Sequence, residues 1–245
     1  MRRMLYMFLG SFLLFTSCKK EEQKLTIATA ANMQFAMDSL VKNFELKTGI
    51  PCQTVIGSSG KLTAQITAGA PYDIFVAANM KYPNALFEKG LTANKPKIYA
   101  HGKLVLWTLD ANIKPSIDIL NSQEINHIAL ANPDTAPYGT AAMEVLSFYK
   151  LNETLKNKLV FGESIAQTNS FIHSQSAEIG FTSLSTIKAP KLVNKGAWIE
   201  IDTKFYKPIE QGIVLLKKHN KDAQQFYDFL FTEEARQILT HFGYE

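Results

Sequence analysis

The sequence predicts an α/β protein of two lobes, each containing a mixed, mostly parallel sheet flanked by helices. Apolar segments of strand length alternate with helical patterns along most of the 245 residues, which is typical of βαβ units. The alternation breaks at 102–108 and again at 208–218, where an apolar strand has no clear helix after it. We therefore expect the chain to cross between the lobes twice, with a ligand in the cleft between them.

Residues 1–17 are predicted to form a signal peptide. Arg2 and Arg3 precede an apolar run that is too short to span a bilayer. The run ends in a pattern that resembles a bacterial lipobox, so we expect Cys18 to carry a lipid; the alternative is a cysteine that merely follows an ordinary signal. Residues 18–24 then form a polar tether. The protein is expected in the periplasm or at the cell surface, anchored to the membrane through its lipid.

Charge and cysteine content exclude several classes of protein. The formal net charge is +4, and removing the two arginines of the leader leaves about +2, too small and too evenly spread for nucleic-acid binding. With Cys18 committed to lipid, Cys52 stands alone, so no internal disulfide is expected. We interpret Cys52 as a small buried strand residue rather than a reactive thiol. The five histidines show no metal-ligand spacing, and no metal site is expected.

The first lobe is predicted to extend over residues 25–104 and to be completed by 208–245. Its first part alternates in the order strand 25–29, helix 33–47, strand 53–56, helix 61–68, strand 73–77 and helix 82–89. The long strand within 208–218 returns the chain to this lobe. Such an order predicts strands that run mostly parallel, with helices on the faces of the sheet.

The helices of the first lobe have recognisable faces and ends. The helix expected at 33–47 buries a face that includes Leu40 and Phe44, and Gly49 stands where a left-handed C-terminal cap belongs. At the end of the chain, 223–242 has the pattern of one amphipathic helix or a pair.

The second lobe is predicted to extend over residues 105–207. The strand at 102–108 enters it, and the elements that follow are strand 127–131, helix 140–150, strand 158–161, helix 165–174 and strand 178–182. This is a second block of alternating strands and helices, so the two lobes are expected to have related architectures.

Small uncharged residues fill the junctions where strands pass into helices. At Gly57–Gly60 (GSSG), they let the backbone N–H groups at a helix start face outward, and serine hydroxyls add donors. The same arrangement recurs at 29–32, where Asn32 can cap the next helix, at 136–140, and less clearly at 163–165. One such junction is usually just a capped helix. Several in one two-lobed chain predict a neutral site for an oxyanion.

Several short motifs together resemble one family. They are AANM at 30–33, GSSG at 57–60, AQI at 64–66, GAPYDIF at 69–75, GKLVLW at 102–107, NP at 132–133, APYG at 136–139 and EIGF at 178–181. The set resembles the molybdate-binding proteins of bacterial ABC importers, in the right order over nearly all of the chain from Lys24. The resemblance implies a type II periplasmic-binding-protein fold that closes on molybdate or tungstate, without cofactor or catalysis. It also implies a monomer that delivers its ligand to a membrane permease with an ATPase.

The resemblance assigns oxyanion contacts by motif. They fall on Asn32, Ser59 and the backbone N–H groups of Tyr138 and Ile165, with Ala31 and Ser58 as neighbours and Ser183 as a further candidate. Many relatives have Ser in place of Asn32, so this chain resembles an Asn-bearing branch and the side-chain amide is a candidate donor. Many also have a ligand-contacting Tyr in place of Ser183, so that contact is expected to be absent or to come from Tyr138.

The residue types at these junctions suit a fully deprotonated dianion. Such an ion offers only acceptor oxygens, so an acceptor in the pocket would be left unpaired and repelled. No Asp or Glu stands at a contact position, which argues against hydrogen phosphate, whose proton needs an acceptor. Lys61 and Lys103 are the basic residues nearest in sequence to the candidate contact positions. Each is expected to be a solvated charge that at most steers the anion. Sulfate has the charge and shape of molybdate but is smaller, and it remains an alternative.

Three other functions have weaker support. Ser58 and Lys61 match S-x-x-K, and 47–49 reads K-T-G, which would suggest an exported serine hydrolase of the penicillin-binding class; the order is wrong and no S-D-N follows. The phosphate-binding loop motif of nucleotide-binding proteins is not matched, because Leu62 follows Gly60 and Lys61 where the motif needs Ser or Thr. A sugar or amino-acid binder would use aromatic residues such as Trp107 and Trp198, which we expect to serve packing instead.

Overall fold

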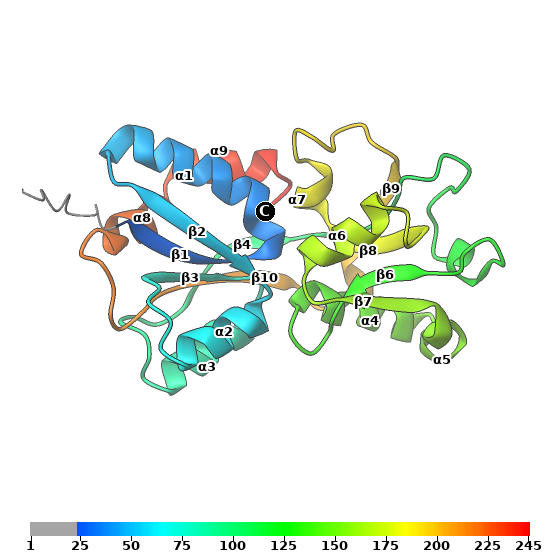
Figure 1. Cartoon of the computed structure of the whole chain (residues 1–245), viewed down its shortest axis with the longest axis horizontal. Coiled ribbons are helices and arrows are strands. Elements are labelled where there is room, and N and C mark those ends of the chain that lie inside the picture. The colour runs from blue at the N-terminus through cyan, green and yellow to red at the C-terminus, as the bar shows by residue number, and fades with distance from the viewer. Residues whose placement is uncertain (1–23) are drawn as a thin grey trace, which may run out of the picture.

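The computed structural model describes residues 24–245, which form two lobes side by side (Figure 1). The blue and red ends of the chain share one lobe, and the green and yellow middle forms the other. The predicted signal peptide at 1–17, Cys18 and the tether up to residue 23 lie outside the described residues. The predicted class, α/β with two lobes, is confirmed.

The first lobe contains a five-stranded sheet in the order β2-β1-β3-β10-β4. Its strands are β1 (Leu25–Ala30), β2 (Cys52–Gly57), β3 (Ile74–Ala77), β4 (Lys97–Gly102) and β10 (Ile209–Leu215). β1 runs parallel to β2 and β3, whereas β10 runs antiparallel to β3 and β4. The sheet is therefore mixed, and one of its inner strands comes from the last part of the chain.

Helices cover both faces of this sheet. They are α1 (Gln34–Thr48), α2 (Ser59–Thr67), α3 (Lys81–Glu88), α8 (Ala223–Phe229) and α9 (Glu233–His241), with a 3-10 turn, η1 (Ala31–Met33), before α1. α1 and α9 lie on one face, and α2 and α3 on the other (Figure 1). Successive residues of β1 serve the two faces: Ile27 packs in the cluster with α1, and Ala28 in the cluster with α2. Leu40 and Phe44 are buried as predicted, and Gly49 is the left-handed cap of α1 with φ 70°.

The second lobe contains a five-stranded sheet in the order β7-β6-β8-β5-β9. Its elements are β5 (Leu104–Thr108), η2 (Asp118–Asn121), β6 (Ile128–Ala131), α4 (Pro137–Phe148), α5 (Asn152–Leu155), η3 (Lys156–Lys158), β7 (Leu159–Gly162), α6 (Ile165–His173), β8 (Ile179–Ser183), α7 (Leu184–Ile187), β9 (Ala197–Glu200) and η4 (Thr203–Phe205). β6 runs parallel to β7 and β8, and β5 runs antiparallel to β8 and β9. The two sheets therefore share one pattern of parallel and antiparallel pairs.

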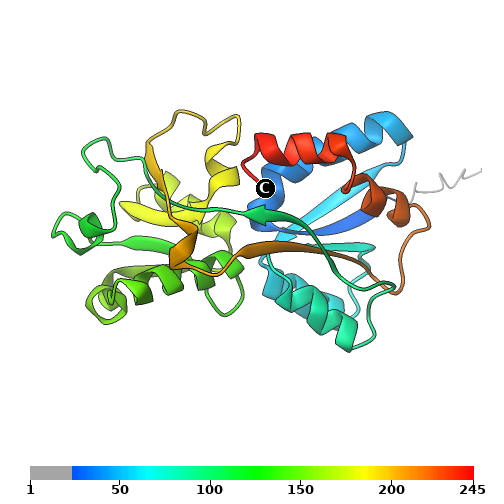
Figure 2. The ribbon, with the colours of Figure 1, turned by 180° about the vertical axis from the view of Figure 1, so that it is seen from behind.

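The chain crosses between the lobes at Lys103 and again between β9 and β10. Figure 2 shows β4 and β10 from behind, side by side where they approach the second lobe. Gly102 ends β4 in the first sheet, and Leu104 begins β5, where it pairs with Ser183 in the second. The single strand expected at 102–108 is therefore two strands, because each part finds its partners in a different sheet. Leu104, expected in the first lobe, belongs to the second sheet.

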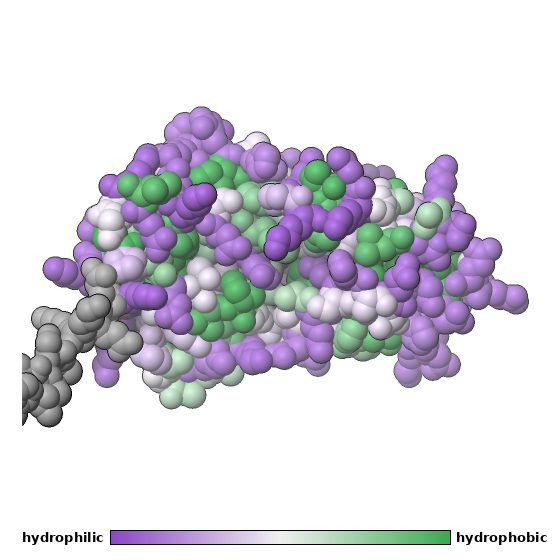
Figure 3. All heavy atoms as spheres, turned by 45° about the horizontal axis from the view of Figure 1, so that its top comes forward, coloured by the Kyte–Doolittle hydropathy of each residue, from purple (hydrophilic) through white to green (hydrophobic). Residues whose placement is uncertain are grey.

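The surface carries a mixture of residue types. On the face in Figure 3, hydrophilic residues surround small hydrophobic patches over both lobes. Within residues 24–245, no helix is both long enough and apolar enough to cross a bilayer.

Candidate functional site

A small pocket lies where the two lobes meet. About 200 Å³ of space, part of it open to solvent, lies between its lining residues. The first lobe contributes Ala30, Ala31, Asn32, Ser58, Ser59 and Ala78, and the second contributes Ala136, Pro137, Tyr138 and Ile165. Six of the seven positions predicted from the resemblance are therefore brought together, although they come from four separate segments of the chain.

The pocket is surrounded by the beginnings of helices. β1 leads into η1, β2 leads into α2, and α4 and α6 begin at Pro137 and Ile165. The first N–H groups of a helix have no partner within it, and the helix dipole adds partial positive charge at that end. Several helix starts at one pocket make an environment that favours a bound anion.

The two serines of the GSSG junction present hydroxyl groups whose acceptor capacity is partly used. Ser59 Oγ accepts a 3.0 Å hydrogen bond from the backbone N–H of Ala78. Ser58 caps α2, and its Oγ accepts from the N–H of Lys61 at 3.3 Å. Both serines are buried, with exposed fractions of 3% or less. Each hydroxyl therefore keeps its own proton for a ligand.

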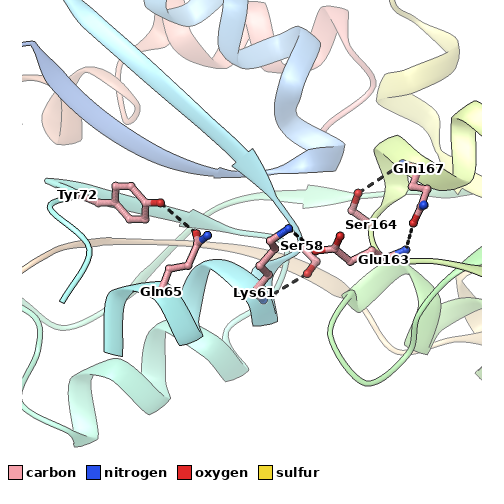
Figure 4. A network of polar contacts seen from close by, with 7 residues as sticks. All are labelled: Ser58, Lys61, Gln65, Tyr72, Glu163, Ser164 and Gln167. Carbon is pink, nitrogen blue, oxygen red and sulfur yellow. Dashed lines mark hydrogen bonds and ion pairs between the residues drawn. The ribbon is translucent and has the colours of Figure 1, made fainter. Parts of the chain in front are cut away.

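The second lobe presents two backbone donors. Pro137 occupies the first turn of α4, and among the hydrogen bonds of residues 24–245 none uses the N–H of Tyr138. At the start of α6, Ser164 Oγ accepts from the N–H of Gln167 (Figure 4). No hydrogen bond among the described residues uses the N–H of Ile165. Tyr138 and Ile165 were both predicted to contribute N–H groups, and both line the pocket.

Asn32 lines the pocket but does not cap a helix. η1 follows Ala30, and no side-chain cap is present there, so the predicted capping role is wrong. The amide nitrogen of Asn32 instead donates to Gln211 Oε1 at 2.8 Å and to Tyr244 Oη at 2.9 Å. These two bonds use both protons of the amide, so the side chain has none left for a ligand. What Asn32 can still offer is its backbone N–H.

Ser183 does not lie among the pocket-lining residues. It is fully buried at the end of β8, and its Oγ lies 2.9 Å from Ser185 Oγ and 3.0 Å from Thr186 Oγ1. The hydroxyl of Tyr138 does not replace it at the pocket. It is buried beside Gly102, where a Cβ would overlap it, and it has no hydrogen-bond partner among the described residues.

Among the residues of 24–245 that line the pocket, none carries a formal charge. Lys61 Nζ pairs with Glu163 at 2.7 Å between the lobes (Figure 4), and both side chains are about half exposed. Lys103 pairs with Glu200 at 3.2 Å and Glu245 at 2.6 Å. The hydrogen bond that Lys103 donates to Glu245 is the main reason that the pKa of Lys103 is raised. Within residues 24–245, no group of three or more His, Cys, Asp or Glu residues could hold a metal ion.

The lobes are in a closed arrangement around the pocket. The N–H of Gly60 donates to the carbonyl oxygen of Thr135 at 2.9 Å, and Tyr82 Oη donates to the carbonyl oxygen of Asp134 at 3.0 Å. Both bonds join the first lobe to the loop before α4. Closure removes water from the pocket and strengthens any electrostatic interaction inside it.

This geometry agrees with the comparison to known families. The model of the bacterial extracellular solute-binding protein family matches residues 25–245, which is all but one of the described residues. The chain belongs to this family. The molybdate-binding protein ModA of Azotobacter vinelandii is 37% identical to this solute-binding protein over 241 residues, 96% of this chain and 94% of the relative. The ModA of Rhodobacter capsulatus is also 37% identical, over 89% of this chain and 86% of the relative.

Solved structures agree with the sequence relatives. The periplasmic molybdate-binding protein of Azotobacter vinelandii superposes on this solute-binding protein with a TM-score of 0.85 and 32% identity. The superposition covers 91% of this chain and 99% of that one. The resemblance inferred from the motifs is therefore confirmed, and so is the two-lobed fold of periplasmic binding proteins.

Three residues that hold Asn32 from behind the pocket were not predicted from the sequence: Gln211, Tyr244 and Ser185. Gln211 carries a signal that could have found it, since its position in β10 alternates with the half-buried Glu210 and so points a polar side chain into the interior, where it is fully buried. A buried amide in a strand needs partners, and Asn32 is one of them. Tyr244 and Ser185 carry no comparable signal, because their partners lie far away in sequence.

Proposed function

We propose that this protein is the solute-binding component of an ABC importer and that it binds molybdate or tungstate in the interlobe pocket. The observation that carries the proposal is an interlobe pocket whose lining, among the described residues, is uncharged and stands mostly at the beginnings of helices. A dianion without a proton needs donors alone, and this pocket supplies hydroxyl and backbone N–H donors without a carboxylate. The names of the relatives from Azotobacter and Rhodobacter support the same ligand.

The donors come from both lobes. The first lobe supplies the hydroxyls of Ser58 and Ser59 and the backbone N–H groups at Ala31 and Asn32, and the second supplies those of Tyr138 and Ile165. About six charge-assisted hydrogen bonds of roughly 1.5–3 kcal/mol each are enough to offset desolvation and leave micromolar or tighter binding, a binding free energy of about −8 kcal/mol. Closure of the lobes on the anion then forms the complex that docks on the permease.

The rest of the proposal concerns where the protein works. We expect it to be exported, anchored through a lipid on Cys18, and to act as a monomer with a permease and its ATPase, without catalysis or nucleic-acid binding. The motif around Cys18 supports the anchor. Replacing Cys18 by Ala should release the exported protein from the membrane fraction, whereas replacing Cys52 by Ala should leave it there.

A serine hydrolase is the alternative from another functional class. Lys61 would have to activate Ser58, but its Nζ pairs with Glu163, and the only bond between the two residues is from the backbone N–H of Lys61. Hydrolysis of nitrocefin or an activated ester that is lost in Ser58→Ala would support the hydrolase. Absence of turnover in the wild-type protein would favour the transport role.

Titration calorimetry of the mature protein with molybdate, tungstate, sulfate and phosphate tests the assigned ligand. Molybdate or tungstate should bind with micromolar or lower Kd, and phosphate should bind far more weakly, because the pocket has no carboxylate to accept its proton. Sulfate is discriminated by size alone and should bind at least about tenfold more weakly. Sulfate binding as tight as that of molybdate would overturn the assignment.

A further inference from the structure

Behind the pocket, four side chains form a buried hydrogen-bonded cluster. They are Asn32, Gln211 and Tyr244 of the first lobe and Ser185 of α7 in the second, each with an exposed fraction of 3% or less. Asn32 is the one member of the cluster that also lines the pocket. The cluster therefore has direct contact with the site through a single residue.

Asn32 is held by both its side chain and its backbone. Its amide nitrogen donates to Gln211 Oε1 at 2.8 Å and to Tyr244 Oη at 2.9 Å. Its carbonyl oxygen accepts from Ser185 Oγ at 2.6 Å and from Tyr244 Oη at 2.9 Å. A carbonyl oxygen has two acceptor positions, and here two hydroxyls are available to fill them. The carbonyl oxygen of Asn32, which would repel an anion, is therefore bound by these two hydroxyls.

Gln211 and Tyr244 are themselves fixed. The amide nitrogen of Gln211 lies 3.2 Å from the carbonyl oxygen of Ile209 and 3.4 Å from that of Ala78, which orients its Oε1 toward Asn32. The N–H of Tyr244 donates to the carbonyl oxygen of Leu239 at 3.0 Å, and the next residue exchanges two backbone hydrogen bonds with His101. The backbone that carries the Tyr244 side chain is therefore fixed by hydrogen bonds at Tyr244 and at the residue after it.

We infer that Tyr244, with Ser185 and Gln211, is a positioning residue of the oxyanion site: it fixes Asn32 so that the N–H groups of η1 face the pocket. The inference rests on the proposed function for its ligand. Tyr244 itself does not line the pocket, and the bond of Ser185 to Asn32 joins the two lobes beside it. A loss of this cluster should therefore loosen the site without removing a donor that touches the ligand.

Tyr244→Phe tests the inference, because it removes the hydroxyl and keeps the ring. We expect molybdate to bind about tenfold more weakly, chiefly through faster dissociation. Hydrogen exchange in the ligand-free variant should rise in the segment 30–37 and stay unchanged in α8. Tyr227→Phe is the matched control, since Tyr227 is equally buried and its hydroxyl has no hydrogen-bond partner among the described residues. It should leave affinity and exchange unchanged.

A double-mutant cycle separates positioning from general destabilisation. Tyr244 and Ser185 donate to the same carbonyl, so Tyr244→Phe and Ser185→Ala should have non-additive effects on affinity. Wild-type affinity in Tyr244→Phe, with exchange at 30–37 no faster than in Tyr227→Phe, would overturn the inference. If the wild-type protein fails to bind molybdate, the proposed ligand is wrong, and the exchange comparison still decides whether Tyr244 fixes Asn32.

Discussion

The backbone N–H of Gly60 donates a 2.9 Å hydrogen bond to the carbonyl oxygen of Thr135, and this bond joins the two lobes at the pocket. A Cβ on Gly60 would lie 2.9 Å from Thr135 Cα and 3.1 Å from its carbonyl oxygen. These are backbone atoms that cannot rotate away. The closed arrangement therefore requires glycine at position 60.

Gly60→Ala should prevent full closure. We expect oxyanion affinity to fall by about tenfold or more, because the lobes can no longer bring all donors to the ligand. The melting temperature of the ligand-free protein should not fall, since alanine is better in a helix than glycine by about 1 kcal/mol. Calorimetry and small-angle scattering measure the two effects. Thr67→Ala, at the exposed far end of the same helix, is the control, and equal affinity in both variants would contradict the prediction.

Ser59→Ala should remove a ligand contact and a structural hydrogen bond together. Affinity should fall by about tenfold or more, and the free energy of unfolding should fall by about 1 kcal/mol because the N–H of Ala78 loses its acceptor. Thr108→Ala is a matched control, since Thr108 is buried in the second lobe and donates to the carbonyl oxygen of Glu178. It should lose stability but keep affinity. Calorimetry and chemical denaturation distinguish the two variants.

Lys61 and Glu163 should affect the rate of binding more than its strength. Their side chains are 51% and 55% exposed, so the ion pair contributes less than about 1 kcal/mol. Lys61→Ala should slow association of the dianion and weaken its dependence on salt, and Glu163→Gln should speed association. Stopped-flow fluorescence at several salt concentrations measures this. Lys47→Ala removes a pair with Glu234 elsewhere in the first lobe and should have no effect.

Molybdate affinity should be constant between about pH 6 and about pH 9, because no pocket-lining group titrates in that range. Tyr138 is the one residue with an ionisable side chain among the described residues that line the pocket, and burial raises its pKa well above the ordinary value. A raised pKa keeps the phenol neutral up to a higher pH, so no negative charge develops beside the ligand. Calorimetry across this range is the measurement. A loss of affinity centred within it would indicate a titrating group at the site.

The sequence predicted the elements that have strong periodicity and clear ends. α1 with its cap at Gly49, the parallel strands and the strand-to-helix junctions all follow from local patterns that the structure contains. The edge strands β4 and β9 were not predicted. Their residues alternate poorly and are largely exposed, so burial leaves little signal in the sequence.

The site was predictable only as far as it depends on local structure. The N–H groups at Tyr138 and Ile165 follow from where helices begin, and both residues line the pocket. The role of Asn32 did not follow, because its partners Gln211 and Tyr244 are 179 and 212 residues away. Periodicity and capping rules describe neighbours in sequence, whereas this amide is held by partners that only the tertiary fold brings near.

The position of β10 between β3 and β4 has a consequence for the order in which the chain can fold. The first lobe begins at residue 25, yet its sheet cannot be completed until residues 209–215 have been synthesised. Until then β3 and β4 have no strand between them, and their unpaired edges are open to other chains. The first sheet of the growing polypeptide stays incomplete until almost the whole chain is available, so these strand edges need protection from aggregation during synthesis.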